Sequence, residues 1–295
     1  MPRYAIIEAP SILGLKPTGV DRLPAVLLQH GLAEQLRARR AGRVVPTAAY
    51  DTKRDPQTLT LNAPGIAEYS VQLADAVTDV VERDEFPVLL GGDCSILLGS
   101  TLALRRRGRY GLLFIDGHAD FYQPEANPNG EAASMDLALA SGRGPAILTN
   151  IESRGPLVRD EDSVVFAFRD TEEQVHYGSQ TLPPGMLALD LTRVRECGVE
   201  AGAQEAVRHL TRERRPSDGF WIHLDADVLN DAIMPAVDYR LPGGLSWVEL
   251  DGVLRIAMDS GRAVGIEITI YNPKLDPDGA SGKGLTATVV KALAG

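Results

Sequence analysis

The chain has 295 residues, of which 44% are hydrophobic and 24% are charged. This ordinary globular composition excludes a disordered, collagen-like or coiled-coil protein. The 30 lysines and arginines against 40 acidic residues give a formal net charge of −10, which argues against nucleic-acid binding as the main task. An acidic excess is also expected where some carboxylates bind cations.

Two cysteines, Cys94 and Cys197, are too few for a disulfide framework, which fits a reducing compartment. The first residues lack the apolar core of a secretory signal. No apolar run approaches the ~18 residues that would predict a membrane-spanning helix. We therefore expect a cytoplasmic protein with no membrane partner.

Short apolar runs alternate with longer stretches of helical periodicity along the chain. The predicted strands are Tyr4–Ile7, Arg43–Val45, Pro87–Leu90, Gly111–Ile115, Val164–Phe168, Met186–Leu189, Phe220–Leu224 and Ala263–Ile268. The predicted helices are Leu23–Arg39, Ile66–Arg83, Ile96–Arg106, Ala132–Ala140, Gly202–Arg214, Trp247–Ser260 and Lys283–Leu293. This order predicts a three-layer α/β fold, a mostly parallel central sheet with helices on both faces. No repeat or linker divides the chain, so we expect a single domain over residues 1–295.

Polar side chains able to bind metal follow directly on three of the predicted strands. The three segments are 91–95 (Gly-Gly-Asp-Cys-Ser), 116–120 (Asp-Gly-His-Ala-Asp) and 225–227 (Asp-Ala-Asp). In open α/β sheets, binding sites form beyond the carboxyl ends of the strands. All three segments therefore fall where a functional site is expected.

The spacing within two of these segments favours metal binding. Asp116, His118 and Asp120 are two residues apart, as are Asp225 and Asp227, and residues two apart in extended backbone point the same way. Asp and His together suit Mn²⁺, Zn²⁺, Fe²⁺ or Co²⁺. Two divalent ions would offset the repulsion among the four carboxylates. The alternative is that these groups are solvated residues of strand-end turns.

Taken together, these segments resemble those of the ureohydrolase family, which includes arginase and agmatinase. That family carries a Gly-Gly-Asp-His-Ser, an Asp-x-His-x-Asp and an Asp-x-Asp segment, each after a strand. The similarity extends from residues 19–24 through Pro235 and residues 242–245 to residues 265–267. It covers most of the chain in the same order, and it implies an arginase-like fold.

The resemblance implies a site with two divalent metal ions, Mn²⁺ in most of the family. Asp116 and Asp225 would bridge the ions. Cys94 and Asp120 would complete the coordination shell of one ion. His118 and Asp227 would complete that of the other ion.

The same resemblance implies hydrolysis of a guanidino or amidino compound. A water bridging the two ions would be acidified to hydroxide and would attack the guanidino carbon, releasing urea or a related amide and an amine. Asp120 would pass a proton to the leaving amine, and Glu267 would pair with the cationic substrate. Family members are often oligomers, so a homo-oligomer is expected.

One departure from the family is Cys94, which stands where the family has a histidine ligand. A thiolate is softer than an imidazole and shifts the preference from Mn²⁺ towards Zn²⁺, Co²⁺, Fe²⁺ or Ni²⁺. Three interpretations stay open. Cys94 is a metal ligand, a non-ligating neighbour of a weakened or empty first metal position, or a covalent nucleophile, which would need a dedicated base.

A second departure lies in the loop after Asp120. In arginases this loop contains a His-Gly pair that shuttles protons. The loop of this chain has no histidine, which argues against arginine as the substrate. Tyr122, Asn127 and Asn129 are candidate substrate contacts, although Asn-Pro and Asn-Gly also simply form turns. His223, two residues before Asp225, is a candidate donor to a ligating carboxylate, a proton carrier, or an ordinary buried histidine.

Other functions remain to be weighed. A formimino-hydrolase or a deacetylase on a related scaffold would keep the metal site and act on another bond. A deacetylase usually has a His-His pair, which this chain lacks. A catalytically inactive family member is the third alternative. The retained metal-type ligands argue against it, because an inactive scaffold has no need to hold them against their mutual repulsion.

Overall fold

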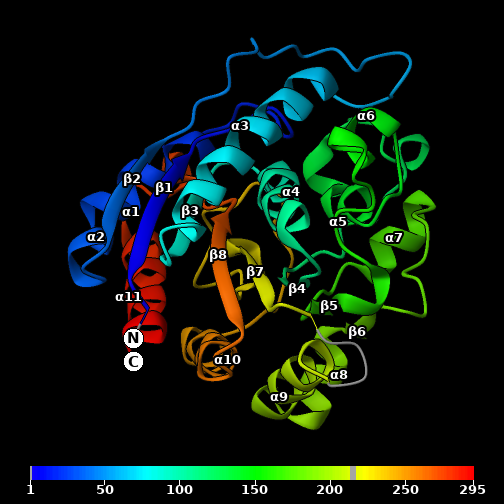
Figure 1. The fold of residues 1–295 in the computed structure, drawn as a ribbon. Coiled ribbons are helices and arrows are strands. Elements are labelled where there is room, and N and C mark those ends of the chain that lie inside the picture. The colour runs from blue at the N-terminus through cyan, green and yellow to red at the C-terminus, as the bar shows by residue number, and fades with distance from the viewer. Residues whose placement is uncertain (1, 213–216) are drawn as a thin grey trace.

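The computed structural model describes residues 2–212 and 217–295. Within them the strands form one eight-stranded sheet in the order β2-β1-β3-β8-β7-β4-β5-β6, and every pairing is parallel (Figure 1). The strands are β1 (Tyr4–Ala9), β2 (Arg39–Arg43), β3 (Phe86–Gly91), β4 (Gly111–Ile115), β5 (Ser163–Phe166), β6 (Leu187–Leu189), β7 (Phe220–Asp225) and β8 (Ala263–Thr269).

Helices cover both faces of this sheet, so the predicted three-layer architecture is confirmed. One face packs against α1 (Leu23–Gln29), α2 (Leu32–Gln35), α8 (Leu191–Cys197), α9 (Val199–Leu210), α10 (Trp247–Asp259) and α11 (Ala280–Ala294). The other packs against α3 (Ala63–Val81), α4 (Leu97–Arg107), α5 (Asp136–Ala140) and α6 (Ala146–Thr149). Figure 1 shows α3 and α4 across the sheet from α10 and α11. A further short helix, α7 (Thr171–Tyr177), follows β5.

The central strands are buried on both faces, as expected for a parallel sheet between two helical layers. In β4, Leu113 and Ile115 belong to the core under α9 and α10, whereas Leu112 and Phe114 belong to the core under α3 and α4. Successive side chains point to opposite faces, so one uninterrupted apolar run supplies both cores. No helix in the described residues is long and apolar enough to cross a membrane.

The N-terminal quarter differs from the sequence-based prediction. The helix predicted over Leu23–Arg39 breaks at Gly31, whose φ of 83° is left-handed, and its last residue begins β2. This strand lies at residues 39–43 instead of 43–45. It is an edge strand with mostly exposed side chains, so it lacks the apolar alternation that reveals a strand. Arg39 pairs with Glu85 at 2.5 Å, and Arg40 with Glu8.

Two helical predictions also need correction. The stretch 132–140 is a 3₁₀ turn followed by α5 instead of one helix. The helix predicted over 202–214 is α9, which begins at Val199 and ends at Leu210; the predicted end at Arg214 lies outside the described residues. Three short helices, α6, α7 and α8, were not predicted.

The strand order places the predicted site segments side by side. β3, β8, β7 and β4 are consecutive in the sheet, and because they are parallel their carboxyl ends meet at one edge. The segments beginning at Gly91, Asp116 and Asp225 follow three of these ends. Residues more than a hundred positions apart in sequence are thereby brought to one crevice.

Candidate metal centre

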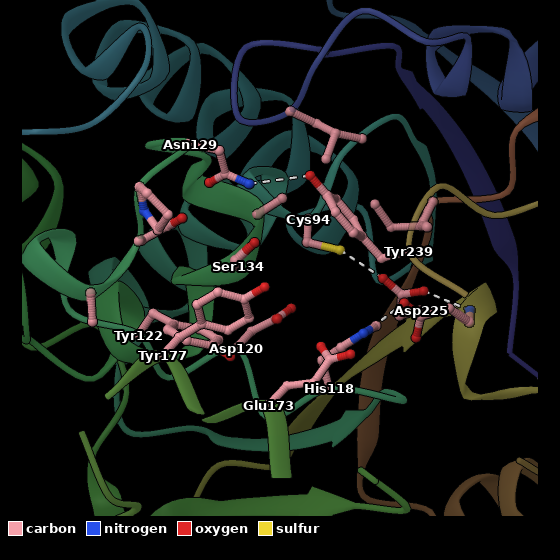
Figure 2. Close-up of a pocket in the computed structure, with 17 residues that line it drawn as sticks. Cys94, His118, Asp120, Tyr122, Asn129, Ser134, Glu173, Tyr177, Asp225 and Tyr239 are labelled. Carbon is pink, nitrogen blue, oxygen red and sulfur yellow. Dashed lines mark hydrogen bonds and ion pairs between the residues drawn. The ribbon is translucent and has the colours of Figure 1, made fainter. Parts of the chain in front are cut away.

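A cavity of about 310 Å³ opens beyond this edge of the sheet (Figure 2). Five of the predicted metal ligands and all three predicted substrate contacts line it, namely Cys94, His118, Asp120, Asp225, Asp227, Tyr122, Asn127 and Asn129. The three other predicted site residues, Asp116, His223 and Glu267, are fully buried beneath it. The folded chain therefore gathers every predicted metal ligand at the cavity floor.

Ligand-type atoms form two groups at this floor, within each of which all atoms lie within 4.8 Å of one another. We call Cys94, Asp116, His223 and Asp225 the inner group, and Asp116, His118 and Asp227 the outer group. Asp116 belongs to both, as expected of a bridging ligand. Asp225, the second predicted bridging ligand, belongs to the inner group, and Asp120 belongs to neither.

The outer group is held by the backbone of the loop after β4. His118 Nδ1 lies 2.9 Å from Asp227 Oδ2. The amide of Gly117 donates to Asp227 Oδ1 at 2.9 Å. A Cβ at position 117 would lie 2.5 Å from Arg169 Nη1 and 2.8 Å from the Asp227 carbonyl oxygen, so only glycine fits there.

The charges of the outer group stabilise one another. Burial disfavours the charged form of His118, but Asp227 and Asp116 outweigh this effect and raise its pKa well above the usual value. Burial also opposes ionisation of Asp227, but His118 and then Arg169 outweigh it and lower the pKa. The result is an imidazole–carboxylate pair whose atoms a divalent cation could bind in place of the shared proton.

The inner group is more deeply buried. Cys94 Sγ donates to Asp225 Oδ2 at 2.9 Å and lies 3.2 Å from Thr269 Oγ1. Burial first, and then the charge of Asp225, raise the pKa of this thiol well above its usual value. A nucleophilic cysteine needs the opposite shift. A bound cation would instead favour the thiolate as a ligand.

Burial and like charges disfavour ionisation of the other carboxylates at the floor. Burial and the charge of Asp227 raise the pKa of Asp116 to about 6. Burial and neighbouring carboxylates raise the pKa values of Asp120, Asp136 and Asp225 well above the usual range. A water-excluded cluster of this kind is typical of a site built for cations, so the donor set and its electrostatics fit divalent metal ions.

Glu267 lies beneath the cavity instead of lining it. Its Oε1 is 2.7 Å from His223 Nδ1, its Oε2 accepts from Ser100 Oγ, and its side chain is fully buried. Ile270, three residues further along the chain, lines the cavity instead. The predicted pairing of Glu267 with a cationic substrate therefore does not agree with its position, which suits support of His223.

The predicted substrate contacts lie in the rim of the cavity. Asn127 donates to the carbonyl of Glu131 at 2.8 Å. Asn129 donates to Glu131 Oε2 at 2.7 Å and to Tyr239 Oη at 3.2 Å, the second of which is visible in Figure 2. Both amides hold the loop in place while their side chains line the cavity, so the turn-forming and the contact interpretations remain compatible.

Four polar cavity residues were absent from the sequence-based prediction. Glu173 and Tyr177 come from α7, Tyr239 from the segment before the Pro-Gly-Gly turn, and Ser134 from the turn before α5. Only α7 left a signal in the sequence. Asp170 stands at its N-cap position, and Glu172 and Glu173 follow in its first turn.

Comparison with known proteins points to one family. The profile of the Arginase family matches residues 4–295. An arginase of Bacillus caldovelox is 28% identical over all of this chain and 97% of that protein, and an arginase of Bacillus subtilis is 27% identical over 99% and 97%.

Solved structures extend the comparison. The crystal structure of the Bacillus caldovelox arginase is similar with a TM-score of 0.88 at 25% identity, covering 100% of this chain and 99% of the other. The proclavaminate amidino hydrolase of Streptomyces clavuligerus has a TM-score of 0.70 at 15% identity, covering 99% and 91% of the two chains, and shares the fold.

Proposed function

Because the chain belongs to the arginase family, we propose that it is a metal-dependent hydrolase that cleaves the C–N bond of a guanidino or amidino compound. The products would be urea or a related amide and an amine. The observation that carries the proposal is the pair of ligand groups that share Asp116 at the floor of an acidic cavity. The names of the relatives, arginase and amidino hydrolase, describe the same class of reaction.

Two divalent ions would be held at the floor. Cys94, Asp116 and Asp225 supply the inner position, and Asp116, His118 and Asp227 supply the outer one. Ions bound there would lower the pKa of water, so that hydroxide is available as the nucleophile at neutral pH. The chain itself contributes a fixed arrangement of carboxylates, because backbone amides hold one oxygen of Asp116, Asp225 and Asp227.

Asp120 is the proposed proton carrier. It lines the cavity but belongs to neither ligand group, so its carboxyl is free to face a substrate. In the metal-free protein, burial and then Asp116 raise its pKa well above the usual value, which favours a carboxyl that can hold a proton. Its backbone has a left-handed φ of 44°, a strain typical of residues placed by function. Asp120 would donate this proton to the leaving amine.

The walls of the cavity indicate a substrate with a cationic head and a partly apolar body. Among the described residues that line it, none is lysine or arginine, and the acidic residues are Asp120, Glu173, Asp225 and Asp227. Leu15, Ile270 and three tyrosines add apolar and aromatic surface to the wall. A guanidinium or amidinium group would lie over the acidic floor, and the tyrosine rings suit an apolar segment of the substrate.

Elemental analysis of the purified protein, followed by a urea- and amine-release screen over guanidino, formimino and acetylated amine compounds, tests the proposal. The screen is run with Mn²⁺, Co²⁺, Ni²⁺, Fe²⁺ and Zn²⁺, which separates the family's Mn²⁺ from the metals that a thiolate prefers. Metal-dependent release of urea or an amide from a guanidino compound is the expected result. A protein that binds no divalent metal, or that turns over only acetylated amines, would contradict the proposal.

A further inference from the structure

Three buried polar atoms at the inner group and beside it lack a hydrogen-bond partner. They are His223 Nε2, Asp116 Oδ2 and Asp136 Oδ2, none of which finds a hydrogen-bond partner among residues 2–212 and 217–295. Nε2 lies 3.8 Å from the Asp116 oxygen and 4.0 Å from the Asp136 oxygen. These separations are too long for hydrogen bonds.

The contacts of Nδ1, the other ring nitrogen of His223, indicate which nitrogen carries the ring hydrogen. Nδ1 lies 2.7 Å from Glu267 Oε1, and Ser100 Oγ donates to the second oxygen of the same carboxylate. An ionised carboxylate only accepts, so beside an ionised Glu267 the neutral ring carries its hydrogen on Nδ1 and presents a lone pair at Nε2. A histidine whose Nδ1–H donates to a carboxylate while Nε2 faces other ligands has the arrangement of a metal ligand with its supporting carboxylate.

The ring is also fixed in direction. His223 lies in β7 beside Phe114 of β4 and Glu267 of β8, and it is fully buried. Its plane is stacked on the Phe114 ring, with 4.5 Å between centroids and 7° between planes. An imidazole held this way cannot turn Nε2 away from the carboxylates, so three electron-rich atoms stay together in a buried space.

A divalent cation would serve all three atoms at once. A single water has two hydrogens for three acceptors, whereas a cation attracts all three. Metal–nitrogen and metal–oxygen bonds of about 2.0–2.2 Å bring two ligand atoms that are nearly 4 Å apart to one ion. Cys94, Asp116, Asp225 and a ring nitrogen of His223 offer ligand atoms that all lie within 4.8 Å of one another, a set of one sulfur, one nitrogen and two oxygens.

We infer that His223 binds the inner metal ion directly through Nε2, in the coordination position that the family resemblance gives to Asp120. The imidazole that is missing at position 94 is thus supplied by strand β7. This inference rests on the proposed function and specifies its metal site. It also explains why Asp120 lies outside both ligand groups and is free for proton transfer.

Glu267 and Ser100 then act as positioning residues for this ligand, and the buried carboxyl of Asp136 lies 4.0 Å from its Nε2. A set of sulfur, nitrogen and oxygen ligands favours Zn²⁺ or Co²⁺ over Mn²⁺ at the inner position. The outer position, with one imidazole and two carboxylates, has no sulfur ligand. The two ions therefore need not be the same metal.

Metal stoichiometry in three variants tests the inference without measuring activity. His223→Gln and Cys94→Ser should each lose one of two bound ions, whereas Asp120→Asn should keep both. His209→Gln, in α9 and outside both groups, is the matched histidine control. Glu267→Gln should weaken the inner ion by about 10–100-fold. Retention of both ions in His223→Gln together with the loss of one in Asp120→Asn would overturn the inference.

X-ray absorption at the zinc edge decides the question even where His223→Gln does not fold. His118→Ala removes the imidazole of the outer group, so the remaining ion reports the inner one. One sulfur and one imidazole bound to that ion would support the inference. Sulfur without imidazole would overturn it and leave the proposed function intact, whereas a wild-type protein free of divalent metal would refute both.

Discussion

The floor and the rim of the cavity are built in different ways. The floor consists of residues at the carboxyl ends of β3, β4 and β7. Most of these residues are buried, and backbone amides hold the carboxylates among them. The rim consists of the loop from Tyr122 to Ser134, α7 and the segment around Tyr239, which are partly exposed and joined by side-chain hydrogen bonds such as Asn129 to Tyr239. The floor is thus rigid, and its charged groups depend on one another. The rim, in contrast, tolerates changes in its side chains.

The difference assigns chemistry to the floor and selectivity to the rim. A change at the floor should alter metal content and turnover together, because each buried ligand balances several charges. A change at the rim should alter substrate affinity and leave the metals in place. The predictions below test this division.

Asp225→Ala should have the largest effect. It removes a predicted ligand of both ions and leaves the Cys94 thiol without its acceptor. We expect loss of bound metal and a drop in kcat/KM of at least about 10³-fold, because the hydroxide nucleophile is lost. Metal analysis and steady-state kinetics measure both. Asp231→Ala, which breaks an exposed ion pair with Arg240, is the control. Full activity with full metal content in Asp225→Ala would remove Asp225 from the site.

Cys94→His should preserve folding and move the metal preference towards Mn²⁺. An imidazole is a harder ligand than a thiolate, and we expect the ratio of Mn²⁺ to Zn²⁺ affinity to rise by about tenfold or more. Competition binding and the melting temperature measure the two effects. Cys197→Ser changes the exposed cysteine and should change neither. Unchanged selectivity in Cys94→His would mean that Cys94 is not a ligand.

Asp116 makes the stability of the metal-free protein depend on pH. Its pKa is about 6 in the folded protein against an ordinary value of 3.8, so between these values the folded state holds a proton that the unfolded state has lost. The metal-free protein should therefore lose stability as the pH rises from 3.8 to about 6.

A divalent ion removes this penalty because it replaces the proton. The gain in melting temperature on adding metal should consequently be larger near pH 8 than near pH 5, as measured by calorimetry. An equal gain at both pH values would show that the carboxylates of the floor do not bind the added ion.

Tyr239→Phe should have the smallest effect. It removes the hydroxyl that donates to Glu131 and accepts from Asn129, so the rim loosens. We expect KM to rise by about fivefold, in line with the loss of one hydrogen bond, while kcat and metal content stay the same. Tyr4→Phe, at the opposite end of the sheet, is the control. Loss of metal in Tyr239→Phe would show that floor and rim are not independent.

The sheet and the position of the site could be predicted from the sequence. Buried strands such as β4 and β7 are short apolar runs, and the polar residues that follow them mark the carboxyl ends where parallel strands form a crevice. The edge strand β2 could not be placed, because its exposed side chains carry no apolar pattern. The break at Gly31 was equally hidden, since a glycine inside a helical pattern shows its left-handed conformation only in the folded chain.

What the sequence determined by itself was the set of chemical groups and the strand ends that carry them. What only the tertiary structure decided was which groups meet. Register between β7 and β8 puts Glu267 beside His223, beneath the cavity, and leaves Ile270 at its wall. The burial of Asp136 and the unpartnered nitrogen of His223 likewise depend on residues from several strands and helices. Partners distant in sequence set the electrostatics of each group, and one-dimensional spacing carries no information about them.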